Sequence, residues 1–154
     1  MTEFIATINQ APHGKGRPRA TSINGRARMF TPNATREWEH FAATELRASW
    51  AGFMFGKGPI APATGPLGLE IVAVFPRTAP MLKRDRKGSY KFQTCRLPYT
   101  QKPDADNVAK SACDALQNAG VIGDDKQIAL LTIGKHYAMI GELPHVEIRL
   151  WSME

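Results

Sequence analysis

Three aspartates and one lysine in the second half of the chain have the types and spacing that metal-dependent chemistry requires. Asp104 and Asp106 are two residues apart, so an extended backbone would place both carboxylates on one side. Lys110 follows Asp106 by four residues, one turn along an expected helix. Asp125 comes after a short glycine turn that can return a third carboxylate to the start of that helix. Because neighbouring carboxylates repel unless a cation lies between them, this pattern predicts a cation site.

Oxygen-only ligands of this kind suit Mg²⁺ or Mn²⁺ and not zinc. A metal bound there, next to a phosphodiester, would polarise the phosphoryl oxygen and activate a water for in-line attack. Lys110 would then stabilise the extra negative charge of the transition state. The residue types therefore indicate metal-dependent hydrolysis of a phosphodiester.

The same residues also have simpler interpretations, which the sequence leaves open. An aspartate before a helix is commonly an N-cap, which would account for Asp106 alone. Asp124 and Asp125 would form a plain turn after a glycine. Lys110 would pair with Asp106 on the helix surface, a contact worth about 0.3 kcal/mol. Asp114, two turns beyond Asp106, is expected on the helix surface.

Other recognisable sites fit the sequence poorly. Residues 104–108 match the D-x-D-x-[T/V] motif of haloacid-dehalogenase-type phosphatases, but no hydrophobic strand precedes them. An EF-hand calcium loop requires glycine where Ala109 stands. Cys95 and Cys113 are too few for a disulfide framework or a thiolate zinc site, and Cys113 is expected to be a small buried thiol. The histidines show no metal-ligand spacing, and no Ser–His–Asp or Cys–His arrangement is evident.

Positive charge is concentrated in two segments of the 154-residue chain. The net charge is +6, but residues 10–36 hold six basic residues and no acidic one, and residues 77–102 hold eight basic residues against one aspartate. Such segments predict contact with a polyanion, although a basic run also occurs simply as a solvated surface. The candidate DNA-binding residues are Lys15, Arg17, Arg19, Lys83, Arg84, Arg86, Lys87 and Lys102.

Three aromatic residues lie among the second set of charges. Tyr90, Phe92 and Tyr99 would either stack on exposed bases or anchor the loop to the core. For Phe92 we expect the anchoring role.

Hydrophobic periodicity predicts an α+β single domain over residues 1–154, with a mixed four-stranded sheet and two main helices in the order β-α-β-α-β-β. Proline and glycine break regular structure in residues 10–34, expected as a loop or irregular ribbon, and in residues 52–66. Gly120 is expected to end the second helix. The predicted elements are strands at 3–9, 67–75, 127–138 and 144–151 and helices at 35–50 and 106–119.

The chain shows no window approaching the roughly 18–20 apolar residues that a membrane span needs, so no membrane contact is expected. Its first residues lack the charged-then-apolar order of a signal peptide. We therefore expect a reduced, cytoplasmic protein.

The order of the motifs resembles the RusA family of Holliday-junction resolvases, found in bacteria and their prophages. The specific part is a D-x-D-N motif, a lysine four residues past its second aspartate, then D-A-L and D-D-x-Q. In this chain these are Asp104-Ala105-Asp106-Asn107, Lys110, Asp114-Ala115-Leu116 and Asp124-Asp125-Lys126-Gln127. The N-terminal region adds Gly16-Arg17-Pro18-Arg19, Phe30-Thr31-Pro32 and Thr35-Arg36-Glu37-Trp38-Glu39.

Carried over residue by residue, the resemblance implies that Asp104, Asp106 and Asp125 are metal-binding catalytic aspartates. Lys110 corresponds to the catalytic lysine, and Asp124 is a secondary candidate for the third carboxylate. The resemblance also implies a RusA-like fold, Mg²⁺ as cofactor with Mn²⁺ as an alternative, and branched DNA as partner. It further implies a homodimer that places two active sites across a four-way junction.

The leading hypothesis is a Mg²⁺-dependent, structure-selective endonuclease that resolves Holliday junctions by paired phosphodiester hydrolysis in DNA recombination and repair. The first alternative is a non-catalytic nucleic-acid-binding module, which explains the charge pattern but leaves the three-aspartate arrangement as coincidence. The second is a nuclease that prefers other branched DNA, such as flaps or forks. Sequence does not separate this second alternative from the leading hypothesis.

Overall fold

A five-stranded mixed sheet forms the centre of the computed structural model, which describes residues 3–16, 19–23, 25–30 and 32–154. The order across the sheet is β1 (Phe4–Ile8), β7 (His145–Ser152), β4 (Leu67–Phe75), β6 (Ile128–Tyr137) and β5 (Leu97–Pro98). Strands β4 and β6 run parallel, and the other neighbouring pairs run antiparallel. The bounds of β4 agree with the prediction, because its apolar run is closed by proline at each end.

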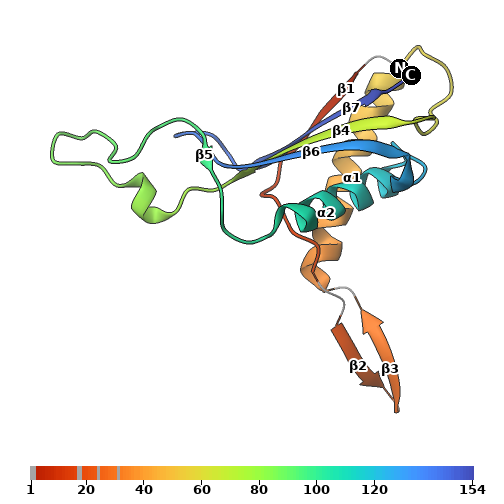
Figure 1. Ribbon diagram of the computed structural model, residues 1–154, viewed down its shortest axis with the longest axis horizontal. Helices are drawn as coiled ribbons and strands as arrows, with labels where there is room; N and C mark the ends of the chain where they lie inside the picture. The colour runs from red at the N-terminus through yellow and green to blue at the C-terminus, as the bar shows by residue number, and fades with distance from the viewer. Residues whose placement is uncertain (1–2, 17–18, 24, 31) are drawn as a thin grey trace.

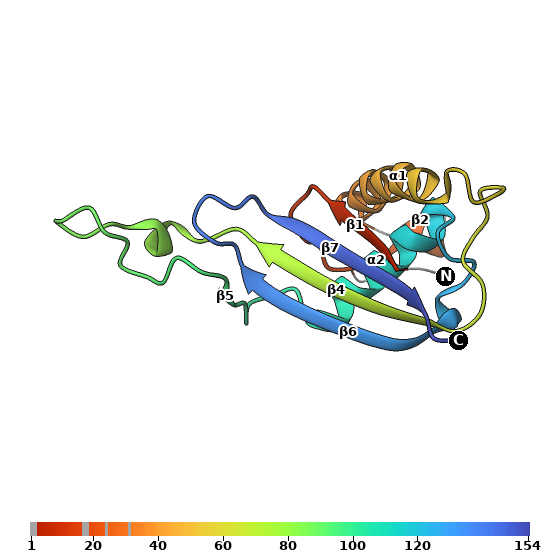
Figure 2. The same cartoon turned by 90° about the horizontal axis from the view of Figure 1, so that it is seen from above.

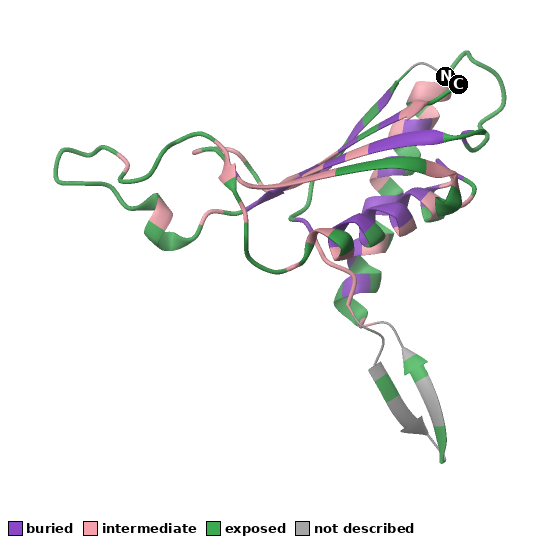
Figure 3. Cartoon of the chain, in the orientation of Figure 1, coloured by how far each residue is buried: buried purple, intermediate pink, exposed green. Residues whose placement is uncertain are grey.

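Two helices, α1 (Asn33–Met54) and α2 (Ala105–Ala119), lie on the same face of this sheet (Figures 1 and 2). Residues coloured as buried lie mainly in these helices and in the strands that they cover (Figure 3). The core there includes Trp38 and Trp50 of α1 and Leu116 of α2, packed with inward residues of β1, β4 and β7. The fold is therefore α+β with the predicted order of main elements.

Two details of the predicted fold are wrong. The sheet has five strands and not four, because β5 is a two-residue strand that pairs only with Tyr137 and His136 at the end of β6. Residues 10–34 are not all loop, since β2 (Arg19–Ile23) and β3 (Arg26–Phe30) form an antiparallel hairpin. Gly25 in its turn has a φ of +72°, which glycine adopts without strain.

Two basic excursions leave the sheet-and-helix body (Figure 1). The β2–β3 hairpin projects beyond the N-terminal end of α1. Residues 76–96, called the basic loop below, project from the end of β4 and contain the short 3-10 helix η1 (Ala79–Leu82). The chain then passes through β5 and enters α2, so the basic loop leads directly to the start of that helix.

The first turn of α2 does not use an aspartate side chain as its cap. The N-cap residue is Asp104, and its side chain makes no capping hydrogen bond. Asp106 lies inside the first turn, so the interpretation of Asp106 as an N-cap is wrong. At the other end Gly120 adopts a φ of +74° and donates its N–H to the Gln117 and Leu116 carbonyls, which confirms the predicted stop.

Candidate active site

A cavity of about 500 Å³ follows the flank of α2, where this helix faces the start of β6 and the 3-10 helix η2 (Asp125–Gln127). Three acidic residues and two lysines line it, and its apolar wall is Ala109, Cys113, Ile128 and Leu131. The charged lining residues are Asp106, Asp114, Asp125, Lys15 and Lys110. The structure thus brings together three of the four residues predicted to be catalytic.

Helical spacing explains the contribution of α2 to this cavity. Asp106, Lys110 and Asp114 follow one another at intervals of four, so they lie along one side of the helix. Asp114, which we expected on the outer surface, lines the cavity, and its side chain is 29% exposed. The spacing of eight residues from Asp106 was the signal that could have placed it there.

The turn after α2 is built so that Asp125 faces the cavity. Asp124 accepts a hydrogen bond from the Lys126 N–H at 3.0 Å and caps η2, and this bond lowers the pKa of the Asp124 carboxyl. The Gln127 amide oxygen accepts hydrogen bonds from the N–H groups of Gly123 and Asp124 at 2.8 and 3.1 Å. These bonds leave Asp124 as the capping residue and Asp125 as the residue that lines the cavity.

Asp104 lies beside this cavity in a neighbouring one. That second cavity, of about 600 Å³, is lined by Asp104, Lys102 and Asn107 together with the segment Pro12–Lys15. The two carboxylates of the D-x-D motif face different cavities because α2 begins between them and ends the extended alternation. Lys15 lines both cavities.

Lys110 is close to Asp106 without being fixed by it. Its Nζ lies 4.0 Å from Asp106 Oδ2, and the side chains are 65% and 68% exposed. A contact of this kind contributes little to stability. Both groups are therefore free to turn toward a ligand in the cavity.

Cys113 forms part of the cavity wall but does not supply a ligand or nucleophile. The residue is buried, as predicted, and burial, with added repulsion from Asp125 and Asp114, raises the pKa of its thiol to about 11. The thiol is therefore protonated at neutral pH, whereas a soft metal or a substrate would need the thiolate.

The donor set fits a hard divalent cation. The three aspartates predicted to bind metal offer carboxylate oxygens from the first turn of α2 and from η2, which are the ligands that Mg²⁺ and Mn²⁺ prefer. Their oxygens do not converge as a set of three within 4.8 Å, since among the acidic, histidine and cysteine side chains described only Glu142, His145 and Glu147 do so. Asp104, Asp106 and Asp125 thus share neighbouring cavities without forming a closed ligand shell.

Lys135 supports the segment that carries Asp104. Its ammonium group on β6 donates to the carbonyls of Gln101 and Pro103 at 2.8 and 2.6 Å. A single lysine in a strand gives no local signal, so the sequence does not point to Lys135. Its contacts fix the backbone just before the start of α2.

The predicted DNA-binding residues that the structure describes lie in several parts of the chain. Lys83, Arg84, Arg86 and Lys87 are exposed on the basic loop, and Lys102 is exposed beside Asp104. Arg17 lies outside the described residues, and Arg19 is in β2, where only the backbone is described. The tip of the basic loop is shaped by Asp85, which accepts hydrogen bonds from the N–H groups of Lys87 and Ser89.

The aromatic residues of this region divide into two roles. Tyr99 stacks on Phe75 and anchors the end of the segment to the sheet. Tyr90 is engaged by Arg84, whose guanidinium lies 4.4 Å from the ring centroid and donates to the Tyr90 hydroxyl. Phe92 is 46% exposed, so the expected anchoring role for Phe92 is wrong.

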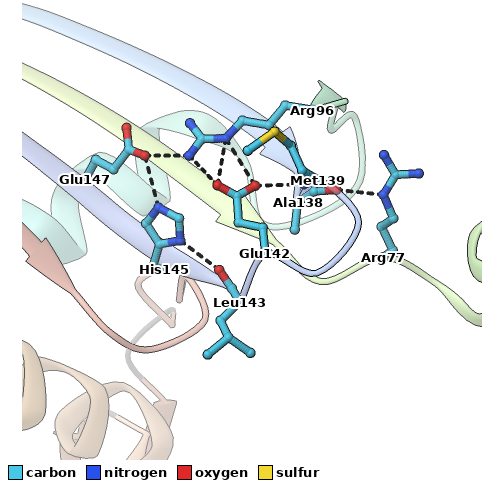
Figure 4. Close-up of polar contacts among 8 residues, drawn as sticks. All are labelled: Arg77, Arg96, Ala138, Met139, Glu142, Leu143, His145 and Glu147. Carbon is cyan, nitrogen blue, oxygen red and sulfur yellow. Dashed lines mark hydrogen bonds and ion pairs between the residues drawn. The ribbon is translucent and has the colours of Figure 1, made fainter. Parts of the chain in front are cut away.

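A cluster around Arg96 fastens the root of the basic loop to the β6–β7 turn (Figure 4). Arg96 donates to Glu142 and Glu147 at 2.5 and 2.6 Å, and His145 contacts Glu147 at 3.0 Å. Arg77 donates from Nε to the Ala138 carbonyl at 2.6 Å. Because the Arg96 guanidinium already hydrogen-bonds oxygens of both carboxylates, we interpret the cluster as an anchor.

None of the described helices is both long enough and apolar enough to cross a membrane.

Comparison with known proteins assigns the family. The family described as "Endodeoxyribonuclease RusA" matches residues 9–151, a range that contains both cavities. The chain is also similar to "Uncharacterized protein YqaN" of Bacillus subtilis (strain 168), with 30% identity over 144 residues, which cover 94% of this chain and 92% of that protein. The resemblance found in the motifs is thereby confirmed, and the chain belongs to the RusA endodeoxyribonuclease family.

Proposed function

We propose that this protein is a divalent-metal-dependent endonuclease that resolves four-way DNA junctions in recombination and repair. The observation that carries this proposal is the shared cavity of Asp106, Asp125 and Lys110, in a chain that belongs to a family of endodeoxyribonucleases. Carboxylate oxygens beside a lysine suit the hydrolysis of a phosphodiester. This reaction needs a bound cation and a group that stabilises the negative charge of the transition state.

Asp104, Asp106 and Asp125 are the residues that would hold the metal, which we take to be Mg²⁺ with Mn²⁺ as a substitute. When bound, such an ion would polarise the phosphoryl group and lower the pKa of a water. Lys110 lies one turn from Asp106 and would approach the phosphate as negative charge develops on it. The carboxyl-lined cavity would also orient the scissile strand for in-line attack.

The exposed basic residues would hold the DNA backbones around this cavity. Lys102 lies beside Asp104 and would contact the strand nearest the site. The basic loop, with Lys83, Arg84, Arg86 and Lys87, and the N-terminal Arg17 and Arg19 would reach flanking duplex arms. Contacts to phosphates position DNA without reading its sequence, so this part of the interface would select shape.

A homodimer would supply the second cut. The free edge of β6 supports this part of the proposal: over residues 128–134 no described strand pairs with β6 on the side away from β4. Leu130 and Leu131 of this edge are each 45% exposed, and Leu131 lines the acidic cavity. Unpaired strand edges with apolar residues favour pairing with another chain. Two copies joined there would present two cavities to one junction.

The test is cleavage of a synthetic mobile four-way junction, with linear duplex, a flap and a fork as comparison substrates. Each is incubated with wild type and with Asp104→Asn, in Mg²⁺ and in EDTA. Paired nicks on the junction that require Mg²⁺ and disappear in the variant are the expected result. Tight junction binding without cleavage in Mg²⁺ or Mn²⁺ would instead identify a binding module, and faster cleavage of flaps or forks would identify another branched substrate.

A further inference from the structure

The short segment before the hairpin is held closely against the start of α2. A Cβ added to Gly14 would lie 2.3 Å from Pro103 Cβ, a distance that real side chains do not reach. The Lys15 N–H donates to the Asn107 carbonyl at 2.9 Å. The backbone of Lys15 is therefore fixed on the same helical turn that carries Asp106.

The other side of this segment is fixed to α1. A Cβ on Gly16 would lie 2.9 Å from both Pro32 Cγ and Thr35 Oγ1. The Gly16 N–H donates to Thr35 Oγ1 at 3.2 Å, and His13 Nε2 lies 3.0 Å from the same oxygen. Two glycines thus let the chain pass between the helices, and Lys15 is the side chain that lies between these glycines.

Two acidic residues, one from each helix, lie next to the Lys15 ammonium group. It hydrogen-bonds with Asp114 of α2, and Glu39 Oε1 of α1 lies 3.8 Å away. The side chain of Lys15 is 33% exposed, whereas that of Lys110 is 65% exposed. The hydrogen bond to Asp114 raises the pKa of Lys15, so the group is charged at neutral pH. Lys15 is therefore a cation held by neighbouring groups, in a cavity whose other lysine, Lys110, is mostly exposed.

The Lys15 side chain lies at the boundary of the two cavities. Lys15 lines the cavity of Asp106 and Asp125 and also the cavity of Asp104. It neutralises Asp114, the one aspartate of the first cavity that is not expected to bind metal. A strand that crosses from one cavity to the other would pass this ammonium group.

We propose that Lys15 contacts the phosphate of the strand being cut, and that Asp114 and Glu39 are positioning residues that hold its ammonium group between the two cavities. This inference rests on the proposed nuclease function. It assigns Lys15 a role in the cleavage step, beyond the backbone gripping that the basic segments provide. The competing explanation is an ion pair that only fastens the segment to α1 and α2.

Single-turnover cleavage at saturating junction separates these explanations. We expect Lys15→Met to cleave about 10²-fold more slowly, as when one fixed donor to a developing charge is lost. Its junction affinity in EDTA should change only several-fold and its melting temperature by a few degrees, and Lys15→Arg should restore part of the rate. Lys57→Met, which removes a lysine just beyond the C-terminal end of α1, is the matched control and should cleave like wild type.

The positioning role has its own readout. Asp114→Asn should slow cleavage, and the double variant Lys15→Met/Asp114→Asn should be no slower than Lys15→Met alone, because Asp114 acts through Lys15. A Lys15→Met protein that cleaves at the wild-type rate, or whose slower cleavage follows a matching loss of thermal stability, would overturn the inference. If wild type itself fails to cleave in Mg²⁺ or Mn²⁺, it is the proposed nuclease function that fails.

Discussion

The ring of Tyr99 is stacked on the ring of Phe75, with centroids 3.8 Å apart and planes 9° apart. The same tyrosine donates its hydroxyl to the Lys102 carbonyl at 2.7 Å. Phe75 ends the central strand β4, and Lys102 begins the approach to Asp104. Tyr99 therefore fastens the backbone before Asp104, the first predicted metal ligand, to the end of β4.

Removing this stack should destabilise the protein and disturb the site. We expect Tyr99→Ala to lower the free energy of unfolding by about 2 kcal/mol, because a partly buried aromatic packing contact is lost. Tyr99→Phe keeps the stack and loses one hydrogen bond, so it should cost about 1 kcal/mol or less. Urea denaturation measures both. Equal losses for the two variants would show that the hydroxyl, and not the ring, is the main contact.

Neighbouring aspartates of η2 should behave differently when each is made neutral. Asp125→Asn should abolish Mg²⁺-dependent cleavage while junction binding stays equal or becomes tighter, since negative charge leaves a DNA-facing cavity. Asp124→Asn should keep most of the cleavage activity, because the amide oxygen can still accept the capping bond from Lys126. Cleavage and gel-shift assays on one junction give both quantities. If Asp124→Asn abolished cleavage and Asp125→Asn did not, the third metal ligand would be Asp124.

The affinity for a four-way junction should fall steeply with salt. With several phosphate contacts, we expect a loss on the order of 10³-fold between about 50 and 200 mM salt. The double variant Arg86→Ala/Lys87→Ala, at the exposed tip of the basic loop, should reduce the slope of log affinity against log salt by about two. Fluorescence anisotropy at several salt concentrations is the measurement. An affinity that does not change over this range would exclude the backbone-gripping role.

Acid should weaken the anchor of the basic loop. The Arg96 guanidinium hydrogen-bonds Glu142 and holds the pKa of this carboxyl below its ordinary value of 4.5. A carboxyl whose pKa is lower in the folded chain stabilises the fold above its unfolded pKa, and this contribution is lost as pH falls through the folded pKa. The free energy of unfolding should therefore fall on acidification below about pH 4.5. Glu142→Gln should lack this component.

Denaturation of wild type and Glu142→Gln between about pH 3 and pH 6 tests this expectation. Glu37→Gln, which changes an exposed residue of α1, is the control and should follow wild type. Parallel pH profiles for wild type and Glu142→Gln would mean that Glu142 has no role in the acid response.

The free edge of β6 should control association. We expect wild type to sediment as a dimer and Leu130→Lys as a monomer with similar melting temperature, because a charge on an exposed strand edge opposes pairing. The monomer should lose coordinated paired nicks. Leu143→Lys, at a residue that is 80% exposed in the β6–β7 turn, should remain dimeric. A wild-type monomer, or a dimeric Leu130→Lys, would place the proposed dimer elsewhere or exclude it.

Elements with strong local patterns were predicted well. Residues 67–75 form a strand as expected, because an apolar run closed by prolines has few alternatives. Gly120 ends α2 because its left-handed conformation brings its own N–H and that of Val121 to the last carbonyls of the helix. The hairpin of Arg19–Phe30 was missed, since it is basic and has no apolar alternation to mark it. The two-residue strand β5 is too short to leave a pattern at all.

In the candidate site, too, the features with a local sequence pattern were predicted and the contacts between distant residues were not. The glycine turn does bring Asp125 to a cavity that Asp106 also lines. The period-two argument for Asp104 and Asp106 does not account for the start of α2 between them, and the two residues line neighbouring cavities. The contact between Lys15 and Asp114 joins residues 99 positions apart, so no local spacing could reveal it.

Because the basic loop is anchored at its root and exposed at its tip, its two ends should affect different rates of DNA binding: the tip association, and the root dissociation. At its exposed tip, Arg86 and Lys87 extend the positive field outward and, in the proposed function, would govern how often DNA is captured. At its root, the contact of Arg96 with Glu142 would leave little conformational freedom to be lost in the proposed DNA complex, so this contact would govern how long the complex lasts. Loss of a tip charge should slow association, whereas loss of the root contact should shorten residence on the DNA.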